Sequence, residues 1–130
     1  MAKIGDEDHT FDYIIDCRGF PTDFSDYNLS DCSLLNHCLV HDHKTFNPVE
    51  ATEHRATKNG WMFGVPLQSR CGYGYLYNDE ITSKVDAIAD MSELLKVPVN
   101  ELTIREYSFK PYYAKKILDN RILKNGNRAL

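Results

Sequence analysis

Residues of the types that can bind metal ions are concentrated between positions 32 and 43. They are Cys32, His37, Cys38, His41 and His43. Cysteine thiolates and imidazoles are the ligands that zinc prefers, and four of them make a closed structural site. The spacing of this cluster matches none of the usual zinc-finger patterns. On a strand, His41 and His43 would share one face while Cys38 takes the other. We therefore expect a partly buried strand with ordinary histidines, and a small Cys/His metal-binding module remains an alternative function.

Aromatic residues supply a second candidate site in the middle of the chain. The two-residue period of a strand puts Trp61, Phe63 and Val65 on one face, and Pro66 ends the pairing because proline has no N–H. The following run, Gly74–Tyr77, is short and aromatic, and its glycines suit a bend or a close backbone approach. The segment predicts two strands around a tight turn, which by residue types alone is an ordinary half-buried hairpin.

The order of these residues matches a known sequence motif. A few residues after the first strand ends at Pro66, the chain has Arg70, Gly72, Gly74 and Tyr75. Gly-Trp-x-Trp-x-Ile-Pro followed by Arg-x-Gly-x-Gly-Tyr is typical of the flavin-dependent tryptophan halogenases, and this chain resembles that family. Phe63 stands where the motif has its second tryptophan, and Val65 stands where it has isoleucine. In the family this aromatic pair lines the space between the flavin and the halogenation site. The loss of an indole at position 63 therefore implies a change of substrate more than of chemistry.

Both ends of the chain carry the same resemblance. Phe11–Phe20 looks like the family's Ile-Asp-Cys-Ser-Gly-Phe strand and turn, with Arg18 as the departure. Lys116–Leu130 resembles a segment that ends in Gly-(Asn/Asp)-Ala-Ala, although the tryptophan of that segment is missing here. The resemblance places the chain in the middle of a much longer enzyme, with its closest likeness to viral members.

The resemblance implies a chemistry in which reduced FAD, supplied by a flavin reductase, and oxygen convert halide to hypohalous acid. The acid travels through a tunnel and halogenates an electron-rich aromatic substrate, indole-like or other. The resemblance also implies that Trp61 and Phe63 line this tunnel and that Pro66 fixes the end of their strand. It further implies that Gly126 and Asn127 approach the flavin. The family's catalytic lysine and glutamate belong to segments outside this sequence, so no catalytic residue is assigned.

The sequence also lacks the turn that would hold FAD tightly. That turn is Gly-x-Gly-x-x-Gly between a strand and a helix, whereas the only Gly-x-Gly here, Gly72 and Gly74, lies inside the predicted hairpin. We expect the chain alone to be inactive. The net charge of −4 and the scattered basic residues argue against nucleic acid, and no apolar run is long enough for a membrane span. With no signal peptide, we expect reduced cysteines and a cytoplasmic protein.

The coarse pattern predicts one helix among several strands. Ser83–Asp86 is similar to a capping box, and Val85, Ile88, Met91 and Leu95 recur at helical spacing, which predicts a helix over Thr82–Lys96. The predicted strands are Tyr13–Asp16, Leu34–His41, Ala51–Ala56, the central hairpin, Thr103–Phe109 and Arg121–Lys124. The opening residues, the stretch from Phe20 to Asp31, the Asn47-Pro48 turn and Pro111–Leu118 are expected to be loops or turns.

The expected fold class is α+β, a mostly antiparallel sheet with one main helix. By resemblance it is a partial flavin monooxygenase-type (FAD/NAD(P)-binding) fold, in which residues 1–130 form a single partial domain. This domain would comprise the substrate side and the edges of the FAD domain, where the first and last predicted strands join a parallel sheet. A fragment of a related FAD-dependent monooxygenase without halide chemistry is the other enzyme that the sequence allows.

Overall fold

A computed structural model describes residues 2–44 and 51–130, so the predicted turn at Asn47-Pro48 lies outside the described residues. The chain forms two compact units. One unit is Cys32–Lys110, and the other joins Met1–Asp31 to Pro111–Leu130.

The 32–110 unit is built on a five-stranded antiparallel sheet with the strand order β6-β7-β8-β5-β9. The strands are β5 (His37–His43), β6 (Glu53–Thr57), β7 (Gly60–Pro66), β8 (Cys71–Tyr77) and β9 (Ile104–Ser108). The predicted central hairpin is confirmed as β7 and β8, and Pro66 is the last residue of its strand. The second strand begins at Cys71, three residues earlier than its aromatic run indicated, because Pro66 and Cys71 already pair beside the turn.

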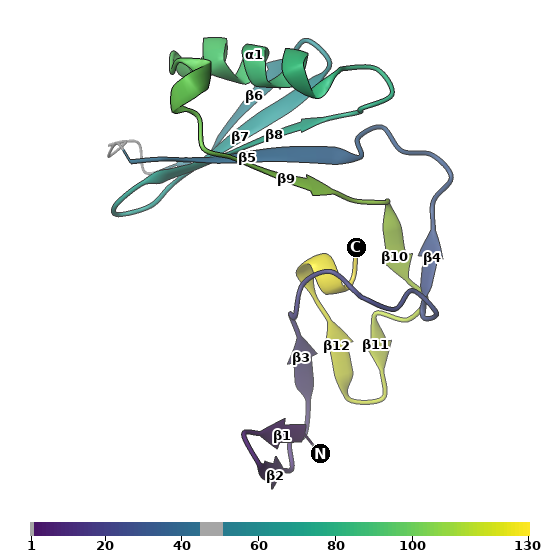
Figure 1. Ribbon diagram of the computed structural model, residues 1–130. Coiled ribbons are helices and arrows are strands. Elements are labelled where there is room, and N and C mark those ends of the chain that lie inside the picture. The colour runs from purple at the N-terminus through teal and green to yellow at the C-terminus, as the bar shows by residue number, and fades with distance from the viewer. Residues whose placement is uncertain (1, 45–50) are drawn as a thin grey trace. The chain divides into compact units, whose positions relative to one another are not determined.

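A single α-helix among the described residues, α1 (Lys84–Leu95), lies over one face of this sheet (Figure 1). The predicted N-cap is confirmed, since the Ser83 hydroxyl accepts the Asp86 N–H at 3.1 Å. Lys96 adopts a left-handed conformation with φ of 55° after the last turn, and Pro98 follows. No helix in the described ranges is both long and apolar enough to cross a bilayer.

The core of this unit lies between α1 and the sheet. Its buried members are Leu39, Met62, Tyr75, Tyr77, Ala87 and Met91. The predicted helix face is right at Met91 and, in part, at Ile88 and Leu95, but wrong at Val85, which is 75% exposed. Ala87 is buried instead, because it precedes Met91 by four residues and shares its face, whereas Val85 precedes Met91 by six and lies on another side of the helix.

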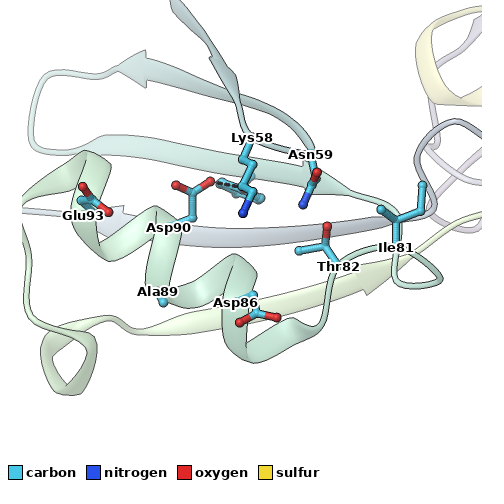
Figure 2. Close-up of a pocket in the computed structure, with 9 residues that line it drawn as sticks. Lys58, Asn59, Ile81, Thr82, Asp86, Ala89, Asp90 and Glu93 are labelled. Carbon is cyan, nitrogen blue, oxygen red and sulfur yellow. Dashed lines mark hydrogen bonds between the residues drawn. The ribbon is translucent and has the colours of Figure 1, made fainter.

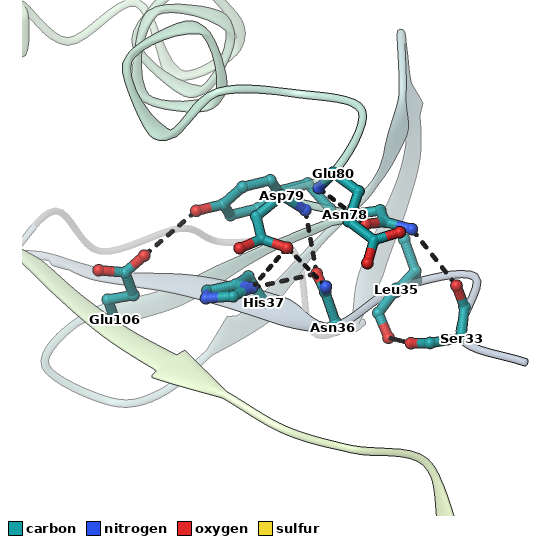
Figure 3. A network of polar contacts seen from close by, with 9 residues as sticks. Ser33, Leu35, Asn36, His37, Asn78, Asp79, Glu80 and Glu106 are labelled. Carbon is teal, nitrogen blue, oxygen red and sulfur yellow. Dashed lines mark hydrogen bonds and ion pairs between the residues drawn. The ribbon is translucent and has the colours of Figure 1, made fainter. Parts of the chain in front are cut away.

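A network of polar contacts fixes the segment that leads from β8 toward α1 (Figure 3). The Asn36 side chain donates to Asp79 at 2.6 Å and accepts the Asp79 N–H at 3.0 Å. Tyr77 donates from its hydroxyl to Glu106 at 3.2 Å, and Lys84 of α1 donates to the same carboxylate at 2.6 Å. These contacts tie β5, β8, β9 and the start of the helix together.

The other unit consists of short strands. They are β1 (Ala2–Ile4), β2 (Glu7–His9), β3 (Ile14–Asp16), β4 (Tyr27–Leu29), β10 (Tyr112–Ala114), β11 (Leu118–Asp119) and β12 (Ile122–Lys124). β3 and β12 pair in parallel, as the resemblance implied for the first and last predicted strands. The loop predictions are wrong at β1–β2, β4 and β10. For β4 and β10 the reason is distance, since each has only three residues and Tyr27 pairs with Ala114, almost ninety residues away, which leaves little local pattern.

The burial difference along α1 can be tested by truncating one buried and one exposed side chain. Met91→Ala empties a fully buried position and should cost about 2–5 kcal/mol of unfolding free energy. The matched control Val85→Ala, on the same helix, should change stability by less than about 0.5 kcal/mol. Urea unfolding of the two variants checks this, and similar losses would contradict the packing described for α1.

Candidate functional site

Three aromatic rings form a row on the sheet face opposite α1. Trp61 and Phe63 contact each other with ring centroids 5.7 Å apart, and His54 of β6 lies 5.3 Å from the Trp61 ring. The alternating burial of β7 explains the arrangement, since Met62 and Gly64 are buried on the helix side while the rings between them are half-buried. The prediction that Trp61 and Phe63 share one face is confirmed. We call His54, Trp61 and Phe63 the aromatic row.

The Phe63 ring lies over the backbone of β8. Phe63 and Gly74 are direct cross-strand partners. A Cβ atom added to Gly74 would come closer than 3.0 Å to three carbons of the Phe63 ring. The glycine therefore gives the ring its place on the sheet, in line with the close approach expected at this position.

An ion-pair cluster lies beside the aromatic row. Asp42 of β5 accepts from Arg105 at 2.7 Å and from Arg70, in the β7–β8 turn, at 3.3 Å. Asp42 pairs across the sheet with Gly72, so its carboxylate shares the face of the aromatic row. Two guanidinium groups for one carboxylate leave a positive excess at this corner of the face.

The Cys/His cluster divides between the two faces of β5. The His41 and His43 rings lie together, with centroids 5.8 Å apart, and the Nδ1 atom of His41 accepts the Thr103 N–H at 3.2 Å. Burial lowers the pKa of His41, which keeps this imidazole neutral. Burial raises the pKa of Cys38 to about 11, so its thiol stays protonated at neutral pH. Within residues 2–44 and 51–130, no three His, Cys, Asp or Glu side chains are placed to hold a metal ion.

Gly126 and Asn127 lie in a short 3-10 helix, η2 (Gly126–Arg128), which belongs to the other unit. Gly126 has a φ of +54°, and apart from its chain neighbours no described residue has an atom within 4 Å of the place where a side chain would begin. Two tyrosine hydroxyls donate hydrogen bonds to the backbone of this turn. Tyr112 donates to the Asn127 carbonyl, and Tyr27 donates to the Arg128 carbonyl at 2.9 Å. The turn is therefore exposed but well anchored.

A buried carboxylate fixes the same turn to β3. Asp16 accepts from Arg128 at 3.1 Å and from Arg18 at 2.9 and 2.8 Å. The hydrogen bonds from Arg18, together with both positive charges, hold the pKa of Asp16 far below its usual range. Arg18, which departs from the family's pattern, thus has a structural role here.

A polar cavity on the helix side was not indicated by the sequence reasoning. It has a volume of about 480 Å³ and lies between the β6–β7 turn and α1. Figure 2 shows Lys58 and Asn59 on one side and Asp86, Asp90 and Glu93 of the helix on the other. The spacing of four and three residues between these acids is the sequence signal that places them on one helix face. The cavity is separate from the aromatic row, which lies on the other face of the sheet.

Comparison with known proteins identifies the family to which the chain belongs. The family model for tryptophan halogenase matches residues 3–128. The chain belongs to the tryptophan halogenase family. The family membership accounts for the pairing of an aromatic strand with a glycine-rich strand in the central hairpin.

Among curated halogenases, the chain is 28% identical over 111 residues to tryptophan 7-halogenase KtzQ of Kutzneria sp. (strain 744), a match that covers 76% of the chain and 21% of KtzQ. It is 25% identical over 111 residues to tryptophan 7-halogenase RebH of Lentzea aerocolonigenes, covering 72% of the chain and 21% of RebH. The chain thus spans about a fifth of the length of these relatives.

Solved structures show the same fold. The apo structure of VirX1 matches with a TM-score of 0.72 and 26% identity, over 96% of this chain and 26% of VirX1. A tryptophan halogenase from Shewanella frigidimarina matches with a TM-score of 0.70 and 23% identity, over 91% of this chain and 25% of that protein. A mostly antiparallel sheet carrying one helix is therefore a shared part of halogenase structures.

The anchoring of the Gly126–Arg128 turn can be tested through Asp16. Asp16→Asn removes the charge that binds two arginines and should cost about 1–3 kcal/mol at neutral pH. Because the folded-state pKa is lowered, the native chain should hold this stability above the ordinary aspartate pKa of 3.8 and lose it as the pH falls below that value. The variant should lack this loss, as urea midpoints measured across acid pH would show.

The control for this experiment is Asp119→Asn, which removes a carboxylate that is 57% exposed and lies 3.6 Å from Lys116. An exposed pair of this kind contributes little, so the control should keep the acid sensitivity of the native chain. Equal acid profiles for the Asp16 variant and the control would contradict the anchoring role.

Proposed function

We propose that this chain provides the substrate-facing sheet and part of the flavin-facing edge of a flavin-dependent halogenase, which acts on an electron-rich aromatic substrate. The observation that carries the proposal is the aromatic row. Trp61 and Phe63 occupy the positions of the family's paired aromatic residues, contact each other, and are half-buried on a face that α1 does not cover. An aromatic wall can pack against a planar ring and exclude water while carrying no proton itself.

The replacement of the second tryptophan by Phe63 bears on the substrate. Phenylalanine is the smaller ring, so the wall leaves more room at this position than a tryptophan would. We infer that the substrate differs in size or shape from free tryptophan, while the use of halide, oxygen and reduced flavin is the same. Trp61, Phe63 and Pro66 are the residues assigned to the tunnel wall, with Pro66 closing the strand where the β7–β8 turn begins.

FAD would supply the oxidising chemistry, and the residues present do not fit its pyrophosphate. The only Gly-x-Gly pair lies within β8, and α1 begins several residues after that strand ends. The chain's own contribution is the turn at Gly126 and Asn127, which we assign to the edge of the flavin. Its exposed, anchored backbone and the open space above Gly126 support the assignment. Reduced flavin would come from a separate reductase in the cytoplasm.

The first test concerns cofactor retention. Purified 130-residue chain mixed with FAD should keep no stoichiometric yellow chromophore through desalting, since the described residues contain no glycine-rich strand–turn–helix element to hold the pyrophosphate. A dissociation constant for FAD in the micromolar range or better, measured by flavin fluorescence, would contradict the proposal that this chain does not hold the FAD pyrophosphate. A halogenase that contains the whole flavin-binding region provides the positive control.

The second test enlarges the wall. In a complete halogenase that carries this segment, Phe63→Trp should change substrate or halide preference more than it changes stability, because the added ring would extend into the proposed tunnel and not into the packed core. The matched control is Met62→Trp, which points the same ring into the core, where Met62 is 2% exposed, and should cost about 1–3 kcal/mol. Product profiles and thermal melts decide the matter. A large loss of stability in the Phe63 variant with unaltered selectivity would make its ring ordinary core packing.

A further inference from the structure

The two halves of the halogenase motif meet at one cross-strand pair. Phe63 lies opposite Gly74, and a Cβ atom at position 74 would collide with the Cζ, Cε1 and Cε2 atoms of the ring. The glycine two residues earlier is different. A Cβ atom at Gly72 would meet only Asp42 Oδ1, at an ordinary distance of 3.6 Å. Gly74 is therefore the position on this face where the absence of a side chain decides where a ring can lie.

The position of Phe63 controls the rest of the aromatic row. Its ring contacts Trp61, and Trp61 contacts His54, so a shift of the first ring passes to the second and third. A methyl group at position 74 would lift the Phe63 ring from the backbone or turn it aside, because its carbon would lie closer than 3.0 Å to three ring carbons. A lifted ring narrows the space above the sheet.

We propose that Gly74 is a positioning residue for substrate selection, which sets the height of the Phe63 ring above the sheet and so the size of the aromatic substrate that the wall admits. The inference rests on the proposed function. It gives the second glycine of the Arg-x-Gly-x-Gly-Tyr run a role distinct from that of the first. In the alternative, the Phe63 ring only covers Gly74 and so stabilises the strand at this glycine. That alternative predicts no effect of Gly74 on the choice of substrate.

A double-mutant cycle in the 130-residue chain tests the positioning without any activity. Trp61 is the single tryptophan, so its indole N–H gives one resonance that reports on the row. Gly74→Ala should shift this resonance and lower the melting temperature by about 5 °C or more. In the Phe63→Ala background the same change should do neither, because no ring remains to collide with.

Gly72→Ala is the matched control on the same strand and face, and it should leave the indole resonance nearly unmoved. If Gly74→Ala prevents folding, restored folding in the Phe63→Ala, Gly74→Ala double variant supports the proposal. Equal losses in both backgrounds, or equal indole shifts for the Gly72 and Gly74 variants, would overturn it.

Substrate selection is tested in a complete halogenase that carries this segment. Gly74→Ala should lower kcat/KM for a large aromatic substrate relative to a small one by about tenfold, and Phe63→Ala should remove this discrimination. An unchanged ratio, despite a displaced ring, would overturn the selection role. Failure of the unmodified enzyme to incorporate halide would instead reject the proposed function, and the result of the mutant cycle would still decide the positioning.

Discussion

The structure of the 32–110 unit depends on one constraint, the two-residue alternation of side chains along β7 and β8. Met62, Tyr75 and Tyr77 are sealed against α1, so Trp61 and Phe63 must point to the other face. A slip of one residue would exchange the two sets and place the bulky indole against the helix. The packing of the helix therefore fixes the orientation of the aromatic row, although no ring of the row belongs to the buried core cluster.

Tyrosine hydroxyls link the elements in both units. Tyr75 donates to Asp90 of α1, and Tyr77 donates to Glu106 of β9. Burial raises the pKa of each of these tyrosines to about 12, with the neighbouring carboxylate adding to the shift, so both remain neutral hydrogen-bond donors. In the other unit, Tyr27 and Tyr112 donate to the carbonyls of the C-terminal turn. An aromatic body with a polar end can be buried only where such an acceptor is present.

The chain belongs to the tryptophan halogenase family and matches only part of the longer relatives to which it is similar. The chain spans about a quarter of the solved structures that it matches. The half-buried aromatic row and the exposed, anchored turn are the two surfaces to which we have assigned the proposed roles. The departures at Arg18 and Phe63 differ in kind, since Arg18 binds a buried carboxylate while Phe63 lies in the half-buried aromatic row.

Features that depend on near neighbours in the chain could be predicted from the residues alone. The capping residues and apolar spacing gave the helix, and the alternation before Pro66 put Trp61 and Phe63 on one face. The other features depend on partners far away in the chain. Val85 and Met91 both belong to the apolar set that predicted the helix, yet only Met91 is buried against the sheet. β4 and β10 form strands only because they pair with each other. The contact between Phe63 and Gly74 depends on the register between β7 and β8, which neither strand's sequence specifies alone.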